Sequence, residues 1–338
     1  MEYFVSLQPI RIKKITAMKK YVINKRNIER WKNDVQKSVV FYNDWFLNFA
    51  PTTYINARQD AINKVELAFQ KTECFNSLSI DMLKTSPEVI TILRMATTPP
   101  LARDRIIGLA NVSSNLMGKM EEGRFPPKMK QKEIDESLSR IIDIIYRLLD
   151  ADIMPWLERK SYPHEMDRLL ATHVIGDRVC GSLSDPIIRN EQERRQLKSI
   201  SDYLNDKGYT FVESKDIDNV MTMEAGTYSF HLNVPAKRND NKFVNMPIDV
   251  VIKRKDATPD ELPVLIECKS AGDFTNTNKR RKEETTKIEQ LRNNYGKKVE
   301  FILFLCGYFD SGYLGYEAAE GIDWVWEHRV EDFQKAGI

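Results

Sequence analysis

The sequence predicts an α/β protein in which a mixed sheet flanked by helices follows a large helical N-terminal region. Two observations support this prediction. Apolar residues recur at helical spacing before residue 185, whereas strand-like runs begin near residue 209. Beyond residue 185 a helix, several strands, a second helix and a last strand follow one another, an order typical of an α/β sandwich. We therefore expect a helical region over 1–185 and a sheet-containing domain over 186–338.

In the helical region the clearest element is an amphipathic segment. From Ile134 to Leu149 apolar side chains return every three or four residues, which predicts a helix with one buried face. A shorter stripe of the same spacing covers 62–69. Proline lacks the backbone donor that a helix needs and restricts the residue before it. We therefore expect helices to break at Pro51, at 99–100 and at 126–127.

The second half opens with a predicted helix that begins at Pro186 and ends at Leu204. Strand-like runs then predict strands at 209–213, 227–234, 244–253 and 264–270. A helix over 279–294 precedes an apolar run at 299–309 that suits a strand buried on both faces. This helix is expected to cross over between two parallel strands.

Composition and charge limit the class of protein. Hydrophobic residues make up 42% of the chain and the formal net charge is only +2, which argues against a disordered chain and a histone-like polycation. The charge is unevenly spread, because residues 1–40 hold 10 basic and 3 acidic side chains and residues 237–298 hold 15 and 10. Two basic segments on an acidic remainder are expected of a protein that grips nucleic acid in one cleft. Because the first basic segment belongs to the large helical region 1–185, we expect that region to help form this cleft or a dimer interface.

The four cysteines lie far apart, without a CxxC pair, which argues against a zinc site and against a disulfide framework. No run approaches the roughly 18 apolar residues of a membrane helix, and the first residues lack the apolar core of a secretory signal. We expect a reduced, cytoplasmic protein with no membrane partner.

Two segments, 246–255 and 262–270, combine apolar strand patterns with acidic and basic side chains. Glu267 and Lys269 are two residues apart, so both project from one face of their strand. A turn-forming stretch separates the two segments, and an antiparallel hairpin folded at its middle places Asp249 opposite Glu267. Two carboxylates held this close repel each other, and a divalent cation is the simplest way to offset that repulsion.

This array, PID in the first strand and ECK in the second, resembles the PD-(D/E)xK nuclease superfamily. The isoleucine between proline and aspartate is a departure that leaves the carboxylate in place. The resemblance implies that Asp249, Glu267 and the Cys268 carbonyl bind Mg²⁺, and that Lys269 positions or polarises the attacking water. The alternative is a surface hairpin in which Lys269 forms a cross-strand ion pair.

A third acidic side chain, Glu193, lies on the helix predicted to begin at Pro186. It falls on the apolar stripe of that helix, four residues before Leu197. Many members of the superfamily carry a glutamate on this helix that joins the metal site, so the resemblance implies the same role for Glu193. The alternative is an acid near the helix N-terminus that interacts with the helix dipole, and the sequence leaves both open.

Longer stretches around the array carry a closer resemblance. They read IECKSAGDFTNTNKRRKEETTKIEQL and FLCGYFDSGYLGYEAAEGIDWVWEHR, with PPLARDRIIGLA and DPIIRNEQERRQL upstream. Over roughly 90–330 the chain resembles the XamI-type family of type II restriction endonucleases. The resemblance implies a site-specific, Mg²⁺-dependent endonuclease that cuts double-stranded DNA as a homodimer, in a restriction–modification system with a cognate DNA methyltransferase.

The loop and helix start after Lys269 suit contacts with DNA. Polar side chains, backbone amides and a helix N-terminus accept phosphate groups, and a basic run neutralises backbone charge. The candidate DNA-binding residues are Ser270, Thr275, Asn276, Asn278, Lys279, Arg280 and Arg281. The alternative is an ordinary solvated helix start.

Two other functions stay open at this point. A structure-specific DNA repair or junction nuclease can use the same core fold, and a catalytically decayed relative would bind DNA without cutting it. Comparing the cleavage of branched and linear DNA tests the first alternative. An assay for metal-dependent cleavage tests the second.

Overall fold

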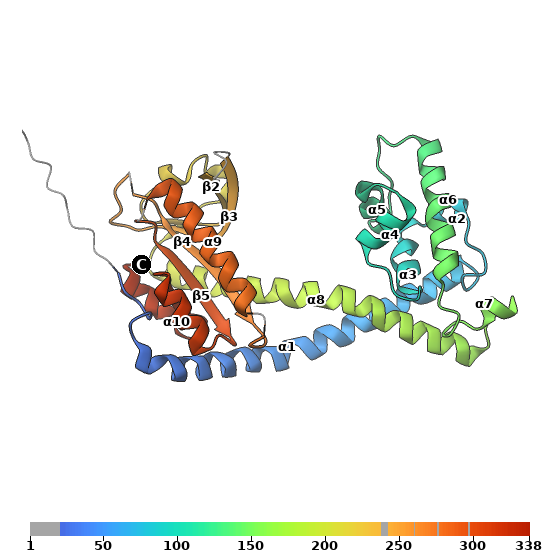
Figure 1. The fold of residues 1–338 in the computed structure, drawn as a ribbon, viewed down its shortest axis with the longest axis horizontal. Helices are drawn as coiled ribbons and strands as arrows, with labels where there is room; N and C mark the ends of the chain where they lie inside the picture. Colours follow the sequence, from blue (N-terminus) through green and yellow to red (C-terminus); the bar gives the residue numbers. More distant parts are fainter. Residues whose placement is uncertain (1–20, 238–242, 260, 276, 297) are drawn as a thin grey trace, which may run out of the picture. The chain divides into compact units, whose positions relative to one another are not determined.

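The computed structural model describes residues 21–237, 243–259, 261–275, 277–296 and 298–338 of the chain (Figure 1). The chain forms two compact units. One comprises Met1–Asn43 and Glu193–Ile338, and the other comprises Asp44–Gln192. The described residues 21–43 thus group with the C-terminal part of the chain, whereas the sequence predicts one boundary near residue 185. The role of the helical region 1–185 in a nucleic-acid cleft or a dimer interface stays a prediction.

The unit Asp44–Gln192 consists of helices and loops around one apolar core, in which Phe69, Ile145 and Trp156 are buried. Its elements include parts of α1 (Ile28–Lys71) and α8 (Glu165–Asp206), and all of α2 (Ile80–Thr85), η1 (Pro87–Val89), α3 (Ile90–Met95), α4 (Arg103–Ala110), α5 (Ser114–Glu121), α6 (Gln131–Leu148) and α7 (Trp156–Arg159). Helix α6 confirms the predicted amphipathic segment. The predicted breaks at 99–100 and 126–127 are also confirmed, because both lie between helices.

Two other proline predictions are wrong. Pro51 lies inside α1 and does not break it, and Pro186 lies inside α8 and does not begin it. An interior proline costs about 3 kcal/mol relative to alanine. Helix α8 buries Val179 before its proline and Ile200 after it, and α1 also buries apolar residues on both sides. Because burying one large aliphatic side chain contributes roughly 1.5–3 kcal/mol, packing on both sides of the proline offsets its cost.

The other unit is built on a six-stranded sheet in the order β1-β2-β3-β4-β5-β6. The strands are β1 (Thr210–Phe211), β2 (Thr227–Lys237), β3 (Phe243–Lys253), β4 (Val264–Ala271), β5 (Phe301–Gly307) and β6 (Asp323–Trp326), with 3₁₀ turns η2 (Ser214–Asp216) and η3 (Val220–Thr222) between β1 and β2. The pairs β2–β3 and β3–β4 are antiparallel. The pairs β1–β2, β4–β5 and β5–β6 are parallel. The predicted mixed sheet is confirmed.

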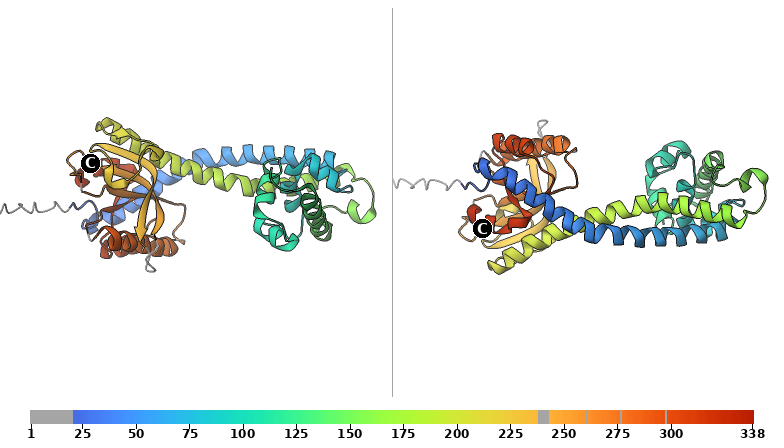
Figure 2. Two further views of the ribbon diagram at one scale, coloured as in Figure 1. Left: turned by 90° about the horizontal axis from the view of Figure 1, so that it is seen from above. Right: turned by 90° about the horizontal axis from the view of Figure 1, so that it is seen from below.

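One face of this sheet is covered by α9 (Thr277–Tyr295) and α10 (Ser311–Ala319), as Figure 2 shows. Ile288 of α9, Leu314 of α10 and Trp31 of α1 pack there against the strands. Helix α9 joins the parallel strands β4 and β5, so the predicted crossover is confirmed. Strand β5 is buried along its whole length, as its apolar sequence predicts.

The opposite face is covered by the end of α8 and by the C-terminal 3₁₀ segment η4 (Glu327–Ala336). Leu204 of α8 and Phe333 of η4 pack there against side chains of β3, β4 and β5. The sheet therefore lies between two layers of helical elements, and its two faces are called the α9 face and the α8 face below.

Hydrogen bonds to one side-chain carboxylate tie Ile23 and Asn24, just before α1, to this unit. The carboxylate of Asp323, at the start of β6, accepts from the backbone N–H groups of Ile23 and Asn24, both at 2.8 Å. These residues are about 300 positions apart in the chain. Local sequence patterns do not encode such a contact, which explains why residues before 44 are not predicted to join the sheet.

Among the described residues, no helix combines the length and the apolar character that crossing a membrane requires. All four cysteines carry free thiols.

Candidate active site

The antiparallel pair β3–β4 carries the predicted carboxylates Asp249 and Glu267. Its residue pairs, for example Val250 with Ile266, follow the hairpin register that the sequence predicts. One step further this register brings Asp249 level with Glu267, where regular pairing has ended. There Asp249 Oδ2 accepts a hydrogen bond from the backbone N–H of Cys268 at 2.8 Å. The aspartate side chain thus joins the two strands where the backbone pairing stops.

The alternation of side chains along β3 is interrupted at Asp249. Ile248 packs on the α9 face, Val250 packs on the α8 face, and Val251 returns to the α9 face. On the neighbouring strand β2, the residue level with Asp249 is His231, whose φ of +51° lies in the left-handed region that residues other than glycine rarely adopt. Such backbone conformations occur preferentially at functional sites. The interrupted alternation on β3 thus lies at the same residue whose carboxylate forms the hydrogen bond to β4.

Glu267 is held by two ammonium groups. Lys269 Nζ lies 3.1 Å from Glu267 Oε1, and Lys287 Nζ lies 2.6 Å from Glu267 Oε2. Lys287 Nζ also donates to the carbonyl oxygen of Pro247 at 2.6 Å. Only 10% of the Glu267 side chain is exposed, so these contacts compensate a charge that is largely removed from water.

Helix α9 adds two residues that the sequence interpretation missed, Glu284 and Lys287. Glu284 is buried, lies 3.9 Å from Lys269 Nζ, and accepts a hydrogen bond from the Tyr313 hydroxyl of α10 at 2.6 Å. A signal was present in the sequence, because Glu284 precedes the buried Ile288 and Leu291 by four and seven residues, and Lys287 precedes Leu291 by four. That spacing places them on the helix face that packs on the sheet.

The charged groups in this cluster shift one another's pKa values. Burial raises the pKa of Asp249, the negative charge of Glu267 raises it further, and the Cys268 N–H and two lysines oppose the shift. Burial lowers the pKa of Lys269, but Glu267 and Glu284 outweigh burial, so this pKa is raised overall. Burial also raises the pKa of Glu284. Lys269 therefore stays a cation near neutral pH, and Asp249 is more stable with positive charge beside it.

The third predicted acidic residue, Glu193, lies on α8 with about half of its side chain exposed. Its Oε1 is 3.6 Å from Nε2 of His231. Gln196 of α8 reaches the sheet more closely, because its amide donates to the carbonyl oxygens of Phe304 in β5 at 3.1 Å and of Lys269 in β4 at 3.4 Å. The described contacts thus connect Glu193 to β2 and not to the carboxylates of β3 and β4.

The predicted DNA-binding residues follow the end of β4. Ser270 is half-buried, and Thr275 is exposed with its backbone N–H 2.8 Å from the Asp273 carboxylate. Asn276 lies outside the described residues. The side chains of Asn278, Lys279, Arg280 and Arg281 also lie outside them, although the backbone of these four residues belongs to α9.

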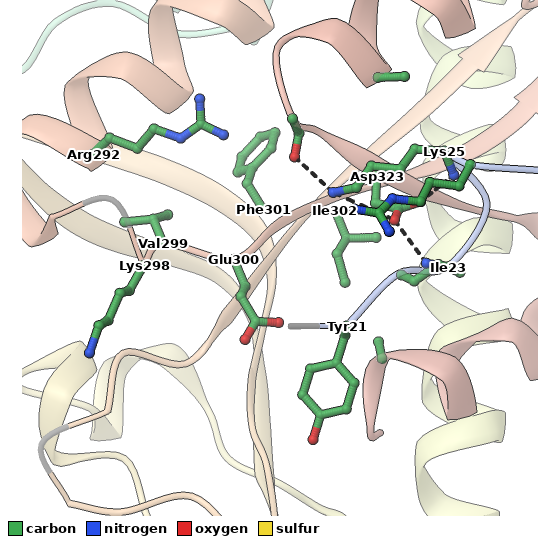
Figure 3. A pocket seen from close by; sticks show the side chains of 14 residues that line it. Tyr21, Ile23, Lys25, Arg292, Lys298, Val299, Glu300, Phe301, Ile302 and Asp323 are labelled. Atoms are coloured by element: carbon green, nitrogen blue, oxygen red, sulfur yellow. Dashed lines mark hydrogen bonds and ion pairs between the residues drawn. The ribbon is translucent and has the colours of Figure 1, made fainter. Parts of the chain in front are cut away.

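Two further observations concern possible binding sites. Among the residues that the structure describes, no group of three or more His, Cys, Asp or Glu side chains could hold a metal ion. A cavity of about 590 Å³ opens near the starts of β5 and β6, where Asp323, Glu300, Lys298 and Lys25 contribute to its lining (Figure 3). None of the four predicted catalytic residues lines this cavity.

Comparison with known proteins reveals extensive similarity. Residues 73–326 match the family model described as XamI restriction endonuclease. The type II restriction enzyme SalI of Streptomyces albus G is 48% identical over 316 residues, which cover 94% of this chain and 100% of that protein. The type II restriction enzyme XamI of Xanthomonas campestris pv. amaranthicola is 25% identical over 269 residues, covering 74% of this chain and 79% of that protein.

Proposed function

This chain belongs to the XamI restriction endonuclease family, and from that premise we propose that its catalytic centre is a PD-(D/E)xK site formed by Asp249, Glu267 and Lys269. The chain is a type II restriction endonuclease, a site-specific deoxyribonuclease. The observation that carries the proposal is the buried cluster on the β3–β4 pair. There Asp249 accepts from the Cys268 N–H, and Glu267 binds Lys269.

The chemistry of the cluster fits Mg²⁺. Asp249 and Glu267 offer carboxylate oxygens, and the Cys268 carbonyl is the proposed backbone ligand. Mg²⁺ is usually held by one or two carboxylates, while water and substrate phosphate complete its coordination, so a third acidic side chain is not required. When bound, the ion would supply positive charge at the phosphate and promote ionisation of the attacking water. Burial and repulsion by Glu267, which raise the pKa of Asp249, favour a cation at this position.

Lys269 acts in this proposal as a fixed positive charge beside the reacting phosphate. Glu267 and Glu284 flank its ammonium group at 3.1 and 3.9 Å, and Tyr313 orients Glu284 through a 2.6 Å hydrogen bond. A charge held in place before the reaction stabilises developing negative charge without having to reorganise. Lys269 also positions the attacking water. We propose Glu284 as a positioning residue, and the catalytic role of Glu193 stays a prediction.

The loop after β4 and the start of α9 are proposed to contact the DNA backbone. They follow Lys269 directly in the chain, so phosphates bound at the site pass close to them. The proposed contacts come from the polar and basic residues predicted above, from Ser270 to Arg281. Basic side chains there would make DNA affinity depend on salt concentration.

We also propose a homodimer that acts on a palindromic site, since a twofold protein dimer matches a twofold DNA sequence. A cognate DNA methyltransferase is the expected functional partner in the same restriction–modification system. Four free thiols suit the reducing conditions of the cytoplasm.

Digestion of a sequenced, unmethylated plasmid with Mg²⁺ tests the proposal. We expect discrete fragments whose mapped ends define one recognition sequence, and no fragments when EDTA replaces Mg²⁺. A continuous smear, or cutting that persists in EDTA, would contradict it. Specific binding without cleavage would instead support a decayed nuclease, and preferential cutting of branched DNA would support a junction enzyme.

A further inference from the structure

Lys287 occupies an unusual position for a helix lysine. Its ammonium group lies 2.6 Å from Glu267 Oε2 and 2.6 Å from the Pro247 carbonyl oxygen, and only 18% of its side chain is exposed. Pro247 lies two residues before Asp249 on β3, and Glu267 lies on β4. The ammonium group therefore bridges the two strands that carry the proposed metal ligands.

The groups around this ammonium are oxygen donors. A carboxylate oxygen and a backbone carbonyl contact it directly, and its positive charge also lowers the pKa of Asp249. Hard divalent cations such as Mg²⁺ and Ca²⁺ select the same kinds of donor. Lys287 thus places a monovalent cation against an oxygen that the proposed metal also uses.

The two lysines beside Glu267 differ in what else holds them. Lys269 contacts Oε1 of Glu267 and lies near Glu284. The Glu284 carboxylate therefore still interacts with Lys269 when Glu267 binds another cation. For Lys287, the other described contact is the neutral Pro247 carbonyl. Lysine is a point charge on a flexible stem, which allows it to withdraw without disturbing the helix.

We propose that Lys287 is an internal counter-cation that binds Glu267 Oε2 while the enzyme holds no metal and releases that oxygen when a divalent cation binds. The proposal rests on the proposed role of Glu267 as a metal ligand. Lys287 is a positioning residue in this scheme. It neutralises and orients Glu267 before the metal arrives, and its competition weakens metal binding.

The test is calorimetric titration of Ca²⁺ into the full-length protein without DNA, with thermal melting in EDTA as a second measurement. Hydrogen bonds to charged groups contribute enough that removing this one should tighten Ca²⁺ binding on the order of tenfold in Lys287→Met. The same variant should melt at a lower temperature in EDTA, because Glu267 loses a partner. Lys287→Arg keeps the charge and should bind Ca²⁺ more weakly than Lys287→Met does.

The matched control is Lys198→Met, which removes a lysine from an exposed pair with Asp202 and should leave Ca²⁺ affinity unchanged. If Lys287→Met does not fold, Lys287→Gln, which retains a donor for Pro247, takes its place with the same expectation. Unchanged or weaker Ca²⁺ binding in the variant that folds overturns the proposal.

A Glu267→Gln variant separates the two levels of inference. Loss of Ca²⁺ binding in Glu267→Gln together with unchanged affinity in Lys287→Met overturns only the role of Lys287. Ca²⁺ binding at wild-type strength in Glu267→Gln overturns the metal role of Glu267, and the counter-cation proposal with it.

Discussion

The two faces of the sheet compensate buried charge in different ways. On the α8 face, Arg195 and Glu327 form a two-point pair, with Nε 2.8 Å from Oε1 and Nη2 3.0 Å from Oε2. On the α9 face, Glu267 shares its two oxygens between Lys269 and Lys287, and Lys269 also approaches Glu284. One arrangement is a matched pair, and the other is a shared cluster.

This difference distinguishes a charged pair that stabilises the fold from a charged cluster that is proposed to take part in the reaction. The guanidinium of Arg195 matches the geometry of the Glu327 carboxylate, so both hydrogen bonds form at once and the two charges neutralise each other; this pair is called the closed pair below. The shared cluster combines three carboxylates (Asp249, Glu267 and Glu284) with two ammonium groups. When all of these groups are ionised, the cluster is short of positive charge. A site short of positive charge can accept a cation, whereas a closed pair mainly stabilises the fold.

The largest expected effect is on catalysis by the shared cluster. Lys269→Ala should lower the DNA cleavage rate about 10³-fold, because a preorganised charge at the reacting phosphate is lost. Cleavage of the cognate plasmid measures the rate, and gel-shift binding in Ca²⁺ should show affinity close to that of the wild type. Lys255→Ala, at an exposed lysine after β3, is the control. Cleavage at the wild-type rate by Lys269→Ala would refute the role of this residue.

Breaking the closed pair should lower the stability of the fold and leave the cleavage rate of the folded protein unchanged. Glu327→Gln should lower the free energy of unfolding by about 1.5–3 kcal/mol, because the guanidinium of Arg195 loses the charged acceptor that it contacts at two points. Urea denaturation measures this change, with the exposed Glu331→Gln as control. Cleavage per folded molecule should stay near the wild-type value. A stable Glu327→Gln protein that no longer cuts DNA would mean that the α8 face also takes part in the chemistry.

Glu284→Gln tests whether the buried part of the shared cluster acts through Lys269. The cleavage rate should fall by about 10–100-fold, as is usual when an outer partner of a catalytic group is lost. Glu284 raises the pKa of Lys269, so its removal should move the alkaline limb of the pH–rate profile to lower pH. Exposed Glu283→Gln is the neighbouring control. A slower enzyme with an unshifted profile would point to a structural defect.

The smallest expected effect is that of Glu193→Gln. Its described partner is His231 at 3.6 Å, and both side chains are about half exposed. Exposed pairs contribute at most about 1 kcal/mol, so cleavage should change less than about fivefold. Plasmid digestion under the same conditions gives the comparison with Lys269→Ala. A loss comparable to that of Lys269→Ala would instead support the sequence prediction that Glu193 joins the site.

The sequence alone predicted the parts of the site that depend on local order. Glu267 and Lys269 share a strand face because side chains alternate along β4. Asp249 comes level with Glu267 because a short turn sets the register of the β3–β4 hairpin. The mixed sheet and the crossover helix followed from the same patterns, together with the apolar character of β5.

Only the tertiary structure revealed the partners that lie beyond the hairpin. Glu284 and Lys287 reach the site because α9 packs on one face of the sheet, and Tyr313 reaches it from α10. The same holds for Pro186, which lies inside α8 because packing on both sides of it outweighs a local preference. Helical spacing indicates which face of a helix is buried, but not which strand that face meets. That choice depends on the packing of the whole core, which no local stretch of sequence contains.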